Sequence, residues 1–250
     1  MESNQMTQSN DRFRVELDGA IARVTLCQGD EGNTLAPPDM GALGKAIEEA
    51  GRNPDIKVVL VRGEGENFCL GRRIIPGVQK PTRARDFRQR VADAILGVYE
   101  HLRATPVPVL TAVQGRAKGF GCAFVAQSDI TLAEEGALFS LPEMDNNLPP
   151  TLAISACLPK MPAKAILDMV ISREEIDAKT AFTHGLVTRV APVKNFDTAI
   201  EHYIAKLADR DRDALVAIKE YMQLAPTMDL AGQARYGANL IAVEMTSQGE

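Results

Sequence analysis

The chain has 250 residues, of which 45% are hydrophobic, and its formal net charge is −5. This length allows one domain with a sizeable core. The acidic balance disfavours a nucleic-acid-binding surface or a basic membrane patch, and no apolar run approaches the ~20 residues of a membrane span. The four cysteines are far apart and form no C-x-x-C pair, so we expect free thiols, no metal site and a cytoplasmic location.

The first twelve residues are polar and lack the apolar middle of a signal peptide, so residues 1–12 are predicted to form a disordered tail. Residues 13–26 then alternate apolar and polar side chains around Asp18-Gly19, which predicts a β-hairpin. A helical pattern follows over 37–52 and a buried strand over 57–63. The next segment, 64–85, is rich in Arg, Gly and Pro and predicts a functional or mobile loop.

The alternation of helix and strand continues along the chain. A helix is predicted from Asp86, a strand over 106–113, a helix over 121–128 and a strand over 129–133. This rhythm predicts an α/β fold in which helices cover a parallel sheet.

The chain changes character after about residue 148, where helical patterns dominate. They cover residues 162–171, 177–184, 196–208, 212–224 and 228–245. We expect residues 13–195 to form the α/β core. Residues 196–250 are expected to form a C-terminal helical region that serves oligomerisation and pocket closure.

The stretch Gly119-Phe120-Gly121 stands where a strand has ended and a helix is about to begin. Backbone N–H groups at a helix start lack partners and lie at the positive end of the helix dipole, so they suit an oxygen that carries negative charge. Alternatively, the glycines serve only to let helix and strand pack closely. The stretch matches neither the P-loop nor the G-x-G-x-x-G phosphate pattern.

Three further segments occur in order around this corner: GEGENFCLGRRI (63–74), ALFSLPEMDNNLPP (137–150) and ISREEIDAKTAFTHGLVTRV (171–190). Together with TAVQGRAKGFGCAF (111–124) they resemble motifs of the enoyl-CoA hydratase/isomerase, or crotonase, superfamily. The resemblance implies a crotonase-like spiral of ββα units and a homotrimer or a hexamer made of two trimers. It also implies an acyl-CoA substrate, with no cofactor beyond the CoA of that substrate.

By position, the resemblance assigns the two amides that bind the thioester oxygen to Arg72 and Phe120. Both side chains depart from the family's small residue and glycine, but a backbone donor needs no particular side chain. Removing a proton α to a thioester creates an enolate, and each oriented amide stabilises such an oxyanion by about 2.7–4 kcal/mol.

The resemblance also assigns Glu143 as the catalytic acid and base. Its apolar sequence neighbours predict a raised pKa, which suits a group that takes and returns a proton. Alternatively, Glu143 is an ordinary glutamate of a surface turn. Ala123 occupies the place of the hydratases' second glutamate; Thr151 offers no replacement, and Asp145 is the nearest other acid.

This pattern favours double-bond isomerisation over hydration. Two alternatives stay open, because a fold does not choose a reaction. One is another crotonase chemistry, such as acyl-CoA hydrolysis, decarboxylation or C–C cleavage. The other is a CoA-binding scaffold with impaired catalysis.

Arg73 and Lys118 are predicted to bind the CoA phosphates, since both are cationic and flank the two corners. The basic loop of Arg73 also contains Arg72, Lys80, Arg83 and Arg85. The alternatives are a solvated loop for Arg73 and an ordinary surface role for Lys118.

Overall fold

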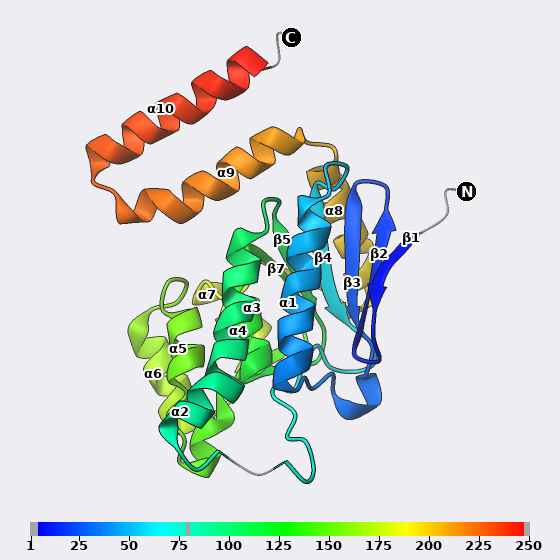
Figure 1. Cartoon of the computed structure of the whole chain (residues 1–250), viewed down its shortest axis with the longest axis vertical. Helices are drawn as coiled ribbons and strands as arrows, with labels where there is room; N and C mark the ends of the chain where they lie inside the picture. Colours follow the sequence, from blue (N-terminus) through cyan, green and yellow to red (C-terminus); the bar gives the residue numbers. More distant parts are fainter. Residues whose placement is uncertain (1–4, 79–80, 248–250) are drawn as a thin grey trace.

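The computed structural model describes residues 5–78 and 81–247, with helices on both faces of a central sheet (Figure 1). The sheet has seven strands in the order β1-β2-β3-β4-β5-β7-β10. Their bounds are β1 Gln5–Ser9, β2 Phe13–Asp18, β3 Ile21–Leu26, β4 Val58–Gly63, β5 Val109–Val113, β7 Ile130–Glu134 and β10 Arg189–Ala191. Strands β1 to β3 pair antiparallel, which confirms the predicted hairpin, and every pair from β3 to β10 is parallel.

The prediction of a disordered tail over residues 1–12 is wrong for residues 5–9. This segment forms β1, which pairs antiparallel with β2. Without β1, β2 would be the edge of the sheet, with a row of unpaired N–H and C=O groups. Backbone hydrogen bonds therefore recruit a polar segment that carries no hydrophobic pattern. Residues 1–4 lie outside the described residues.

Two layers of helices enclose the sheet, and strand β4 shows why. The bounds are α1 Pro37–Arg52, α3 Asp93–Ala104 and α4 Phe120–Gln127 on one side, and α8 Phe196–Ala208 on the other. Val59 and Val61 belong to the core beneath α1 and α3, whereas Val58 and Leu60 pack in a second core with α8. A strand buried on both faces reads as a continuous apolar run, which is why the sequence predicted it.

The helix predicted from Asp86 has an irregular first half. It begins as α2 (Ala84–Phe87), continues as a π-helical segment over Arg88–Ala92 and becomes α3. A π-turn inside a helix is often found at functional sites. Here it widens the helix beside the loop that carries Arg72 and Arg73.

A second sheet of three short strands follows directly from the end of β5. It has the order β6-β8-β9, with bounds Arg116–Lys118, Leu138–Ser140 and Ile176–Asp177. The sequence analysis did not predict this sheet, because strands of two or three residues carry little periodicity. This sheet holds the beginning of α4 beside the short helix η3 (Pro142–Asn146).

The C-terminal part is helical, as predicted, and its last two helices extend from the body as a hairpin (Figure 1). The remaining helix bounds are α5 Thr151–Cys157, α6 Ala163–Ser172, α7 Ala178–Thr183, α9 Arg212–Leu224 and α10 Leu230–Ser247, with short 3-10 turns at Gly29–Glu31, Val193–Asn195 and Ala225–Thr227. Within the described residues, no helix has both the length and the apolar character to cross a bilayer.

One buried lysine fastens α9 to the body. Lys219 is 7% exposed, and its Nζ donates to the carbonyl oxygens of Leu102 and Val107 at 3.0 and 3.1 Å. It also forms an ion pair with Asp129 at 2.7 Å. All three donors of the ammonium group therefore have partners, so its burial is compensated.

Candidate active site

Gly119 is the turning point of the corner between β6 and α4. Its φ of +51° and ψ of −114° belong to a backbone region that residues with a side chain rarely adopt. A Cβ at this position would lie 2.9 Å from Oε1 of Glu143. The corner therefore needs glycine for its turn and for the close approach of this carboxylate.

Gly121 serves close packing instead. A Cβ there would lie 2.2 Å from the carbonyl oxygen of Cys69, so α4 and the segment 68–72 meet backbone to backbone. The packing interpretation of the glycines thus holds for Gly121, while Gly119 faces a titratable group.

The same close approach brings the Arg72 segment beside the Phe120 amide. Gly71 has a φ of +106°, and a Cβ on it would lie 3.0 Å from the carbonyl oxygen of Lys118 and 3.8 Å from the backbone nitrogen of Phe120. The structure thus brings together two corners that are about fifty residues apart in the sequence.

Both predicted oxyanion donors are free. Leu35 N donates to Gly71 O at 3.2 Å and Arg73 N donates to Leu35 O at 2.8 Å, so the amide of Arg72 points away from Leu35. In the described part of the chain, neither the Arg72 nor the Phe120 amide donates a hydrogen bond to a protein acceptor. Unpartnered amides at two adjoining corners are suited to receive an oxygen of a ligand.

Glu143 lies in η3, directly after β8, with a proline before it. Its Oε2 is buried and has no hydrogen-bond partner among the described residues. Burial raises the pKa of this carboxyl above its usual value. A solvated turn glutamate would show neither property, so the geometry favours the catalytic interpretation over the surface one.

No second acid stands beside Glu143 at the positions that the sequence singled out. Ala123 is fully buried in α4, so this position carries a methyl group and no carboxylate. Asp145 is exposed and pairs with Arg173 at 2.9 Å. Thr151 is exposed at the start of α5.

The Phe120 ring belongs to the core. It is 6% exposed and packs edge-on against Phe124, with ring centroids 6.2 Å apart. The ring therefore anchors the first turn of α4, and the residue presents its amide to the corner while its side chain points inward.

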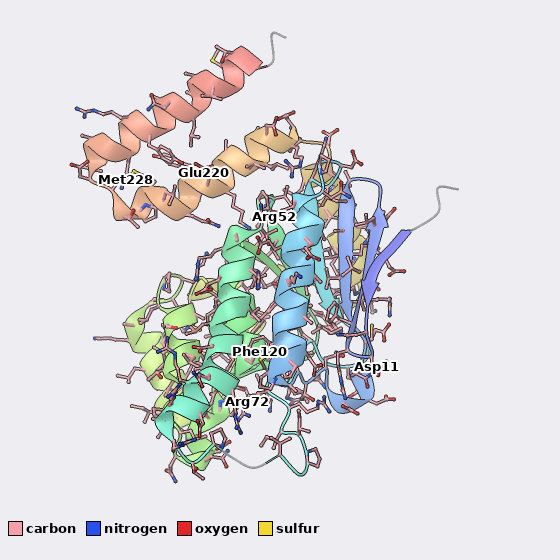
Figure 2. The ribbon with its side chains drawn as sticks, in the orientation of Figure 1. Asp11, Arg52, Arg72, Phe120, Glu220 and Met228 are labelled. Atoms are coloured by element: carbon pink, nitrogen blue, oxygen red, sulfur yellow. The ribbon has the colours of Figure 1, made fainter. Side chains whose placement is uncertain are left out.

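A cavity of about 470 Å³ adjoins the Arg72 corner. Figure 2 labels Phe120 beside the lower part of α1 and Arg72 just below it. The wall of the cavity is mainly apolar, with the guanidinium-bearing Arg72 and Arg73 on one side and the π-helical turn on the other. Other lining residues are Pro37, Ile74, Val78, Val91 and Ala94. Phe120 and Glu143 are not among its lining residues.

Arg73 lies in this wall with part of its guanidinium unused. Its Nη2 is 3.3 Å from Oδ2 of Asp39, which also accepts from the Ala36 amide at the start of α1. Its Nε is buried and has no partner in the part of the chain that is described. This arrangement leaves the Nε donor unused and available to an anionic ligand.

Lys118 lies elsewhere, on the second sheet. Its Nζ pairs with Oε1 of Glu175 at 2.9 Å, and Arg116 shares the same carboxylate. Lys118 does not line the cavity beside Arg72. In the basic loop, Arg83 pairs with Asp86 at 2.9 Å, and Lys80 lies outside the described residues.

Sequence reasoning missed Tyr99 of α3. The side chain is 3% exposed, and its hydroxyl has no partner among the described residues. The available signal was a tyrosine beside Val98 on the buried face of a predicted helix, because a buried phenol needs a hydrogen-bond partner.

The comparisons with known proteins agree with this geometry. The sequence profile of the enoyl-CoA hydratase/isomerase family matches residues 16–248. The chain belongs to this family. The family acts on acyl-CoA substrates, and the predicted α/β class with its C-terminal helices is confirmed.

Relatives and solved structures match most of the chain. Enoyl-CoA hydratase domain-containing protein 3, mitochondrial, of Xenopus laevis is 26% identical over 86% of this chain and 73% of that protein. The (7aS)-7a-methyl-1,5-dioxo-2,3,5,6,7,7a-hexahydro-1H-indene-carboxyl-CoA hydrolase of Rhodococcus jostii is 30% identical over 71% of this chain and 67% of that protein. A crystal structure of enoyl-CoA hydratase from Mycobacterium smegmatis has a TM-score of 0.88 at 23% identity, covering 94% of this chain and 91% of that one. The cytoplasmic location stays a prediction, since one relative is named as mitochondrial.

Proposed function

We propose that the protein is an acyl-CoA enzyme that moves a proton at the carbon α to the thioester. The observation that carries the proposal is the juxtaposition at Gly119. The carboxylate of Glu143, whose Oε2 is buried, approaches this residue, and the amide of Phe120 follows it directly in the chain; neither Oε2 nor this amide has a partner among the described residues. A base beside an oxyanion donor is the minimal arrangement for forming an enolate.

The amides of Arg72 and Phe120 would hold the thioester oxygen. When Glu143 takes the α proton, the electron pair of the C–H bond moves toward the carbonyl and charge gathers on that oxygen. Two amides fixed by the backbone stabilise this charge without reorganising during the reaction. One such donor contributes about 2.7–4 kcal/mol.

Glu143 would return the proton after taking it. Burial raises the pKa of its carboxyl, so the protonated form is a usable acid near neutral pH. Return to C4 of a 3-enoyl thioester moves the double bond from C3–C4 to C2–C3, and one carboxyl is enough for both transfers. Hydration by two glutamates lacks its second acid at Ala123, so double-bond isomerisation is the favoured reaction.

The cationic residues would serve the CoA part of the substrate. Arg73 has a buried, unpartnered Nε in the wall of the cavity that Arg72 borders, which supports a contact with a phosphate. Lys118 would have to share its ammonium group between Glu175 and a phosphate. The structure supports this role less well for Lys118 than for Arg73.

The last two helices would form the interface of a homotrimer, or of a hexamer of two trimers, and help to close the pocket. They expose large apolar side chains although they extend from the body. These are Ile218, Met222, Leu224, Leu230, Ile241, Val243 and Met245. An exposed apolar surface of this kind is typical of a protein–protein contact.

Thioester hydrolysis is the second candidate. It is favoured by the Rhodococcus jostii relative, whose name is that of a carboxyl-CoA hydrolase. In that case the same two amides would stabilise the oxyanion of a tetrahedral intermediate, and the products would include free CoA.

Hydrogen exchange tests the proposal. The purified protein is incubated in D2O with hexanoyl-CoA, and deuterium at the α carbon is followed by mass spectrometry. Exchange is expected, and it should be lost in Glu143→Gln but retained in the control Glu174→Gln, an exposed glutamate. Release of free CoA would favour hydrolysis. Binding without exchange by the wild type would contradict the enzymatic proposal and favour a CoA-binding scaffold.

A further inference from the structure

Tyr99 brings a polar group into the apolar layer between α3, α4 and α5. It is 3% exposed, and its hydroxyl has no hydrogen-bond partner among the described residues. A buried hydroxyl without a hydrogen-bond partner destabilises the folded state, and a phenylalanine at this position would avoid that cost. The presence of the hydroxyl therefore calls for a partner that the described residues do not supply.

The surroundings of Tyr99 place it next to the proposed acid and base. Burial, followed by the charges of Cys157, Cys122 and Glu143, raises the pKa of the Tyr99 phenol. Cys122 and Cys157 are free thiols that share a hydrogen bond. The phenol is consequently protonated at any working pH and is a fixed hydrogen-bond donor within electrostatic reach of Glu143.

The course of an acyl chain follows from the site. In the proposed function, with the thioester oxygen on the amides of Arg72 and Phe120 and the α carbon at Glu143, the acyl chain would continue past Glu143. Tyr99 is carried by α3, which packs against α5 and against α4, the helix that begins at Phe120. Tyr99 and Glu143 do not bond to each other, as each has an unpartnered oxygen.

We propose that Tyr99 is a specificity-determining residue, whose hydroxyl donates a hydrogen bond to an oxygen carried on the acyl chain of the substrate. The substrate class is then an acyl-CoA with an oxo or hydroxyl group beyond the β carbon, rather than a plain fatty acyl-CoA. A site built to pair a polar group discriminates strongly against the analogue that lacks it, because the buried partner is left unpaired. This inference rests on the proposed function of the same site.

The test compares three thioesters: hexanoyl-CoA, 4-oxohexanoyl-CoA and 5-oxohexanoyl-CoA. The measured quantity is kcat/KM for α-proton exchange in D2O, expressed as the ratio of each oxo compound to hexanoyl-CoA. The wild type should prefer at least one oxo compound, and Tyr99→Phe should lower that ratio by about tenfold or more. The control Tyr203→Phe, on α8 across the sheet, should leave the ratio unchanged.

A second measurement separates this role from a structural one. If the hydroxyl has no partner in the free protein, Tyr99→Phe should unfold at the wild-type temperature or above it. A fall of several degrees would show that the hydroxyl is already satisfied inside the free protein, for example by a buried water, and would overturn the inference.

The failures of the two proposals are distinguishable. Exchange by the wild type with equal ratios in wild type and Tyr99→Phe overturns the role of Tyr99 and leaves the proposed function intact. Absence of exchange with all three thioesters overturns the proposed function, and the role of Tyr99 with it.

Discussion

Replacing Gly119 by alanine should damage the site through the backbone and through Glu143 at once. The residue has a φ of +51° with a ψ of −114°, a region that costs a residue with a side chain about 1–3 kcal/mol. The added Cβ would also lie 2.9 Å from Oε1 of Glu143, so the carboxylate must move by several tenths of an ångström. A displacement approaching 1 Å lowers a reaction rate by about 100-fold.

The assay has two parts, thermal unfolding and α-proton exchange with hexanoyl-CoA in D2O. For a chain of this size, the strain of Gly119→Ala should lower the Tm by roughly 2–10 °C. Exchange measured well below that Tm should fall by about 100-fold. The matched control is Gly41→Ala in α1, where a Cβ meets nothing within 4 Å, and it should be neutral or slightly stabilising. Wild-type exchange by folded Gly119→Ala would refute the placement of Glu143.

Three further predictions concern pH, the tether of α9 and the CoA contact. Because burial raises the pKa of Glu143, its carboxylate becomes protonated at a higher pH than that of a free glutamate. The exchange rate should therefore rise with pH through a midpoint above 4.5, and a midpoint below 4.5 would contradict the burial of this carboxyl. Lys219→Met should lower the free energy of unfolding by roughly 3 kcal/mol in a denaturant titration, because the Asp129 carboxylate loses its cationic partner; an unchanged value would show that the ion pair is dispensable. Arg73→Ala should raise KM for acyl-CoA by about tenfold while kcat changes little, and an unchanged KM would exclude the phosphate contact.

Strands β2, β3 and β4 were predictable because the hydrophobic pattern of each strand is visible within its own few residues. Strand β4 is buried on both faces and therefore apolar throughout, and the β2–β3 hairpin alternates around Asp18-Gly19. The edge strand β1 was not predictable in the same way. Backbone hydrogen bonds hold β1 in the sheet, and these bonds do not depend on particular side chains. Its sequence therefore shows no pattern that predicts the pairing.

The candidate site was predictable in part. Gly119 was singled out because its glycine-containing stretch stands between a strand and a helix, and Glu143 because the family resemblance assigns it and its sequence neighbours are apolar. The partner of Lys118 was not, since Glu175 is far along the chain and only the second sheet brings the two together. Tyr99 was overlooked because a tyrosine on an apolar helix face looks like core until its hydroxyl is seen without a partner.

A crystal structure of the protein with a bound, slowly reacting acyl-CoA gives the most direct test of the site. The account predicts that the thioester oxygen lies about 2.7–3.1 Å from the backbone nitrogens of both Arg72 and Phe120. The α carbon should then face the carboxylate of Glu143. A thioester oxygen bound to neither amide, or an α carbon turned away from Glu143, would contradict it.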